Sequence, residues 1–107
     1  MNNYQVDRDK WSKLSIFDQM GNTYSEVGRA FNAKKKGDSE RAWNAVVRAL
    51  DLFDATSWHL AAIKSGKLRE VRRARELFLS EFLDDKDWQI EEYLRHFALT
   101  ARIRKFS

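Results

Sequence analysis

The chain of 107 residues contains no proline and only four glycines. Proline breaks helices and glycine weakens them, whereas a sheet of several short strands needs many turn residues. Apolar residues make up 43% of the chain, which is enough for one packed core at this length. The sequence therefore predicts an all-α fold in which residues 1–107 form a single domain.

Apolar residues recur at steps of three and four in four successive segments, which is the spacing of one helix face. We expect helices over about residues 11–35, 39–63 and 67–83, and a fourth that Asp87 caps. Residues 1–10 precede them as a loose segment. Four amphipathic helices with short loops favour an antiparallel up-down-up-down four-helix bundle. Because a domain this small has modest stability, we also expect a homo-oligomer.

Two features of the first and second segments make local predictions. Gly21 and Gly28 lie seven residues apart on the first apolar stripe, where each costs about 1 kcal/mol relative to alanine. Close approach of another helix explains them, and flexibility is the alternative. Between the segments, Gly37 can adopt a left-handed cap and Asp38 or Ser39 can cap the next helix.

The apolar stripes also predict which side chains are buried. Trp43 and Val47 fall on the stripe of the second segment, and Leu77 and Leu83 widen that of the third. In the first segment, the polar residues Asn22, Glu26 and Arg29 have the spacing of a small hydrogen-bonded ladder on one helix face.

Several function classes find no support in the composition. Cysteine is absent, so there is no disulfide or thiol nucleophile, and the two histidines, His59 and His96, lack the motifs of a catalytic or metal site. We therefore expect no enzymatic activity, no metal and no cofactor. No apolar run approaches the ~20 residues of a membrane span, and the N-terminus lacks an apolar leader, which together favour a cytoplasmic protein without membrane contact.

The stretch KSGKLREVRRARELF, residues 64–78, carries six basic and two acidic residues on a chain of net charge +4. At helical spacing, Arg69, Arg72 and Arg73 share the polar side of the third helix. Arginine suits bidentate recognition of phosphate or carboxylate. The excess charge is therefore the main electrostatic indication of a partner.

Three interpretations of this basic stretch remain open. It can be a solvated face partly neutralised by Asp51, Asp54 or Glu81, since surface ion pairs are common and weak. It can contact an RNA or DNA backbone, or it can bind an acidic protein surface. Trp58, near the end of the second helix, could stack on a base if it is exposed beside these arginines.

Four stretches resemble a known group of proteins: FDQMGNTYSEVGRAF (17–31), RALDLFDAT (48–56), KLREVRRARELF (67–78) and YLRHFALTAR (93–102). They are similar to short bacterial helical proteins, and more distantly to the four-helix-bundle proteins of the ribosomal intervening-sequence group. That group is related to the accessory variability determinant of diversity-generating retroelements, a basic homo-oligomer that binds a reverse transcriptase and its RNA.

The resemblance implies a non-enzymatic RNA-binding accessory protein, with a reverse transcriptase as a further partner. The basic positions that correspond to this role lie in the third and fourth helices and just before them: Lys67, Arg69, Arg72, Arg73, Arg95 and Arg102. The alternative function is a protein-interaction or structural module that uses the same face, or an apolar one, without nucleic acid. A helical ribonuclease would need an arginine and histidine spaced differently from the adjacent Arg95 and His96.

Overall fold

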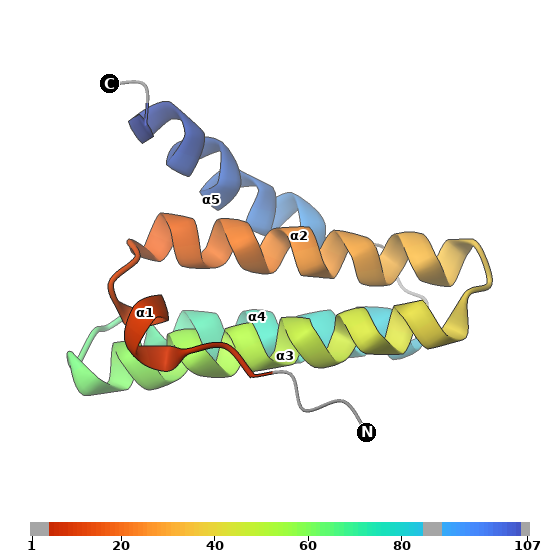
Figure 1. The fold of residues 1–107 in the computed structure, drawn as a ribbon, viewed down its shortest axis with the longest axis horizontal. Coiled ribbons are helices and arrows are strands. Elements are labelled where there is room, and N and C mark those ends of the chain that lie inside the picture. The colour runs from red at the N-terminus through yellow and green to blue at the C-terminus, as the bar shows by residue number, and fades with distance from the viewer. Residues whose placement is uncertain (1–4, 85–88, 106–107) are drawn as a thin grey trace.

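The computed structural model describes residues 5–84 and 89–105, and over these residues the fold is entirely helical (Figure 1). The elements are α1 (Arg8–Ser12), α2 (Ile16–Lys35), α3 (Ser39–Ala62), α4 (Leu68–Asp84) and α5 (Gln89–Lys105). The all-α class is thus confirmed. Helices α2, α3 and α4 lie lengthwise beside one another, whereas α5 rests mainly on α2, which it crosses obliquely (Figure 1).

The first expected helix, residues 11–35, is in fact two helices. The side chain of Ser15 accepts a hydrogen bond from the Asp18 N–H at 3.1 Å and caps α2, so the chain cannot continue straight from α1. The break turns the Trp11 side chain inward, where its indole N–H donates to Thr56 Oγ1 at 2.9 Å. The prediction of one continuous helix was wrong because a serine cap interrupts an otherwise periodic pattern.

Helix α1 and the residue pair before it are held against α3. The Val6 N–H donates to Asp51 Oδ2 at 2.6 Å, and the Val6 side chain packs on Trp11, Leu52 and Ala55. Val6 and the start of α1 fall within the segment 1–10 that the sequence predicts to be loose, and residues 1–4 are outside the described part.

Aromatic rings from three helices form the centre of the core. Phe78 of α4 lies 5.8 Å from the Phe31 ring of α2 and 6.1 Å from the Phe53 ring of α3, measured between ring centroids. All three rings are buried. Burial of this apolar area joins α2, α3 and α4 into one body.

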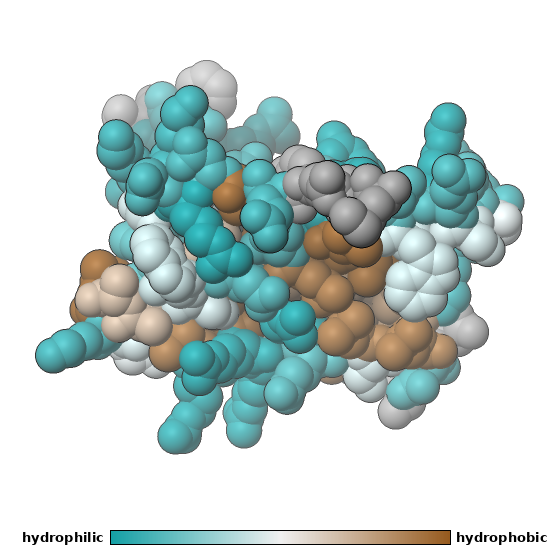
Figure 2. Space-filling view, turned by 60° about the horizontal axis from the view of Figure 1, so that its bottom comes forward, coloured by the Kyte–Doolittle hydropathy of each residue, from teal (hydrophilic) through white to brown (hydrophobic). Residues whose placement is uncertain are grey.

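Four residues that the stripes assign to the core are exposed instead. Trp43 is 50% exposed and Leu83 is 57% exposed, and Val47 and Leu77 are also on the surface. The stripes are wider than the area that neighbouring helices cover, so their edges face solvent. The face of α3 and α4, turned forward in Figure 2, carries an apolar patch beside long polar side chains.

Of the two glycines of α2, Gly21 is the one at which α5 approaches the backbone closely. A Cβ atom added at Gly21 would lie 3.3 Å from Ala98 Cα, whereas one added at Gly28 would meet only Glu91 Oε2 at 4.0 Å. Close approach therefore explains Gly21 but not Gly28.

The N-terminus of α5 is held by a carboxylate from α4. Glu81 is buried, and its Oε1 and Oε2 accept hydrogen bonds from the N–H groups of Gln89 and Ile90, each at 3.0 Å. The cap expected from Asp87 lies outside the described residues. A residue of the preceding helix thus satisfies two backbone donors that a helix start leaves without partners.

Candidate nucleic-acid interface

The arginines of α4 lie opposite its buried face. Val71, Ala74 and Phe78 point into the core, and at 100° per residue this places Arg69, Arg72 and Arg73 on the outer side, where all three are exposed. Lys67, just before α4, is exposed as well. Among residues 5–84 and 89–105, no carboxylate forms an ion pair with these four side chains.

Of the three carboxylates expected to neutralise this face, only Asp54 pairs with an arginine of α4. Asp54 accepts from Arg75 Nε at 2.8 Å. Asp51 accepts from the Val6 backbone and lies 3.8 Å from an Arg8 nitrogen, and Glu81 is occupied at the start of α5. Internal pairing by these three acids therefore reaches only Arg75.

Trp58 borders the basic face. It is 49% exposed and shares a groove of about 470 Å³ between α3 and α4 with two of the arginines. An exposed indole beside guanidinium groups is the arrangement that stacks on an unpaired base while phosphates are held nearby. The groove is lined by Asp54, Ser57, Trp58, Ala61, Arg72, Arg75 and Glu76.

The two predicted arginines of α5 are not part of this face. Tyr93 points toward α4, since its hydroxyl donates to Glu70. Arg95 follows two residues later, about 200° around the helix, and lines a groove with Tyr24 and Lys35 of α2 instead. Arg102 is one heptad beyond Arg95 on the same side and is exposed. The predicted set therefore divides into an α4 group and an α5 group on different sides of the molecule.

The local environments of α5 shift two pKa values. Burial, together with the hydrogen bond to the Glu70 carboxylate, raises the pKa of Tyr93 above its usual range, so this phenol stays protonated at alkaline pH values where an ordinary tyrosine ionises. Burial also raises the pKa of Glu91 from its ordinary value of 4.5; the charge of Lys35 opposes this effect and that of Glu81 adds to it.

The shift at Glu91 predicts a pH-dependent variant. A carboxyl whose pKa is raised on folding favours the native state when protonated, and that contribution is lost as the pH rises through the raised pKa. We therefore expect Glu91→Gln to unfold at a higher temperature than the parent at pH 7, with the difference vanishing well below pH 4.5. Thermal unfolding at both pH values, with Glu76→Gln as control, measures this; equal stability at pH 7 would contradict it.

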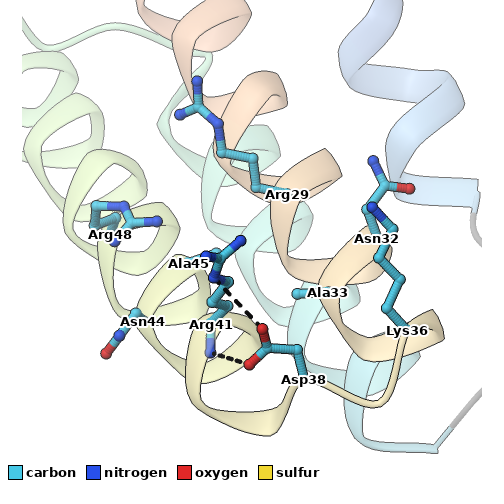
Figure 3. A pocket seen from close by; sticks show the side chains of 9 residues that line it. All are labelled: Arg29, Asn32, Ala33, Lys36, Asp38, Arg41, Asn44, Ala45 and Arg48. Carbon is cyan, nitrogen blue, oxygen red and sulfur yellow. Dashed lines mark hydrogen bonds and ion pairs between the residues drawn. The ribbon is translucent and has the colours of Figure 1, made fainter.

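A second basic groove lies between α2 and α3, and the sequence did not predict it. It has a volume of about 560 Å³ and brings together four cations, Arg29, Lys36, Arg41 and Arg48, with one lining carboxylate, Asp38 (Figure 3).

The polar ladder predicted in the first segment is formed only in part. Arg29 and Glu26 form the expected ion pair within α2. Asn22 is not part of that ladder, because its side chain donates to the Asp18 carbonyl oxygen. The i, i+3 spacing of Glu26 and Arg29 predicted their own ion pair, but no local pattern predicted that Arg48 of α3 also binds Glu26.

A metal site finds no support in the described ranges 5–84 and 89–105. No group of three or more histidine, aspartate or glutamate side chains there is arranged to hold a metal ion. His96 is exposed on α5, and its Nε2 lies 4.0 Å from a Glu92 oxygen. Among these same residues, no helix combines the length and the apolar character that crossing a membrane requires.

Comparison with known proteins found no matching family model, curated protein or solved structure. The function is therefore inferred from the positions of the exposed charged and aromatic side chains.

Proposed function

We propose that this protein is a non-enzymatic accessory protein, an antiparallel four-helix bundle, that binds single-stranded RNA through α4. The observation that supports the proposal is the group Lys67, Arg69, Arg72 and Arg73, exposed together without a carboxylate partner among the described residues. Unpaired guanidinium groups on one face are suited to bidentate contacts with phosphate oxygens.

Trp58 adds a contact that phosphate binding alone does not require. Its exposed indole lies in the groove that Arg72 also lines, so a base can stack there while α4 holds the adjacent backbone. Stacking tolerates any base, which suits an accessory protein that holds RNA without reading its sequence.

The α5 arginines and the partner protein extend this proposal. Arg95 and Arg102 lie on a different side from α4, where they can contact another segment of the same RNA or another subunit. In a homo-oligomer, repeated α4 faces would multiply the affinity of one modest surface. A reverse transcriptase is the protein partner that the sequence resemblance implies.

The test removes three charges from α4. Against a mixed single-stranded RNA, we expect the triple variant Arg69→Gln/Arg72→Gln/Arg73→Gln to bind at least about tenfold more weakly than the parent. The slope of log K against log salt should fall by about 2, since each phosphate contact on a single strand contributes about 0.7. Fluorescence anisotropy over a series of salt concentrations measures both quantities.

A control of equal charge is Lys10→Gln/Lys13→Gln/Lys105→Gln, which changes exposed lysines in α1, directly after α1 and at the end of α5. It should retain most of the affinity. Trp58→Leu should weaken binding without changing the salt slope, because stacking releases no counterions. Equal affinities of the two triple variants would show that α4 is not the binding face.

One observation favours the alternative, a protein-interaction module without nucleic acid. Trp43, Val47 and Leu83 are exposed on α3 and α4 (Figure 2 shows the apolar patch on this face). Exposed apolar surface of this kind marks protein contacts. If neither the parent nor the α4 variant binds RNA and both self-associate equally, this alternative is favoured.

A further inference from the structure

The basic groove between α2 and α3 has an anchored wall. Glu26 is buried, and its two oxygens are divided between helices: Oε2 accepts from Arg48 Nε of α3 at 2.8 Å, and Oε1 pairs with Arg29 of α2. Each guanidinium carries five N–H donors. Holding each arginine through one nitrogen fixes its position and leaves other donors of the same group for a ligand.

The charges around this groove do not balance. Glu26 offsets one charge of the Arg29 and Arg48 pair, and Asp38 lies 3.4 Å from Arg41 Nε. Lys36 has no ion pair within residues 5–84 and 89–105. Four cations against two carboxylates leave an excess of two positive charges, which a dianion would neutralise.

The shape of the groove suits a small ligand. Its floor includes Ala33 and Ala45, whose short side chains leave space where α2 and α3 meet (Figure 3). Two amide side chains, Asn32 and Asn44, also line it and can donate or accept hydrogen bonds. The volume of about 560 Å³ lies in the range of sites for small molecules, roughly 300–1,000 Å³.

We propose that this groove binds a phosphate monoester. Such a group carries about −1.5 to −2 charge at pH 7 and three acceptor oxygens, which match the charge excess and the fork-shaped donors of the arginines. A phosphodiester in the middle of a strand carries only one negative charge and would leave part of the excess unopposed. The ligand is therefore a free nucleotide-sized monophosphate or the 5′-phosphorylated end of an RNA.

The site is independent of the α4 face. It lies on the α2–α3 seam, and its lining shares no residue with the groove around Trp58. It can therefore be present even if α4 binds no RNA, and the two proposals can fail separately.

The test uses titration calorimetry with the full chain and four probes: adenosine monophosphate, adenosine, and one short RNA with either a 5′-phosphate or a 5′-hydroxyl. The groove variant is Lys36→Gln/Arg41→Gln, at two exposed positions. The matched control is Lys10→Gln/Lys13→Gln, which removes two charges at exposed positions outside both proposed binding surfaces. We expect the groove variant to bind adenosine monophosphate at least about tenfold more weakly and the control to bind it as the parent does.

The probes distinguish the sources of the phosphate. Binding of adenosine monophosphate but not adenosine supports a free monophosphate. A preference for the 5′-phosphorylated RNA that the groove variant loses, without binding of the mononucleotide, supports an RNA end. Equal binding of adenosine and its monophosphate, no saturable binding of any phosphorylated probe, or an unchanged groove variant would each overturn the proposal.

Discussion

Replacing Glu81 by alanine is expected to lower the free energy of unfolding by about 3 kcal/mol. Glu81 is 3% exposed and accepts the N–H groups of Gln89 and Ile90. Without the carboxylate, the N–H of the buried Ile90 has no acceptor, at a cost of about 1–3 kcal/mol, and a favourable charge at the start of α5 disappears. Urea denaturation at pH 7 measures the change.

Two further variants separate the causes. Glu81→Gln keeps one carbonyl oxygen but places an amide donor beside a backbone donor, so we expect about half the loss. Glu76→Ala, on the exposed side of the same helix, should change stability by less than about 0.5 kcal/mol. In Glu81→Ala, amide hydrogen exchange should accelerate first in α5, which rests mainly on α2. A loss below about 1 kcal/mol would show that α5 does not depend on this cap.

Replacing Gly21 by leucine should lower the free energy of unfolding by about 2–3 kcal/mol. Even the Cβ atom would lie 3.3 Å from Ala98 Cα, 3.7 Å from its Cβ and 3.8 Å from its N. Backbone cannot turn aside as a side chain does, so α5 must move away from α2. That movement separates the helices along the contact that holds α5 most firmly.

Gly28 on the same helix is the matched control. A Cβ there would meet only the end of the flexible Glu91 side chain, at 4.0 Å. Gly28→Ala should therefore stabilise the protein by about 0.5–1 kcal/mol through helix propensity, and Gly28→Leu should change it by less than about 1 kcal/mol. Chemical denaturation of the parent and these three variants compares the positions. If Gly21→Leu and Gly28→Leu are equally stable, close approach is not the reason for Gly21.

For the α4 face, the helical pattern predicts which arginines are exposed but not which of them form ion pairs. The pattern placed Arg69, Arg72 and Arg73 on one side, and their exposure follows because the opposite side carries Val71 and Phe78. It could not say which arginine is neutralised. Arg75 meets Asp54 across 21 residues, and only the packing of α3 on α4 creates that pair.

The α2–α3 groove could not be predicted from either helix alone. Arg29 and Glu26 are neighbours on α2, but Arg48 joins them from 22 residues away. Lys36 caps the C-terminus of α2, where cations are favoured by the helix end alone, so its position in the sequence does not indicate that it contributes to a shared surface.

Local chemistry determined the helices themselves. With no proline, apolar residues at helical spacing require helix, and the turn after α2 follows from its residues: Gly37 has the expected left-handed φ of 75°, and Asp38 caps α3 by accepting from the Arg41 N–H at 3.1 Å. These outcomes depend on groups a few residues apart. The tertiary structure alone decided which edges of the stripes are covered, how α5 crosses α2 at Gly21, and where charges are left unbalanced, because each depends on distances between helices that no local spacing encodes.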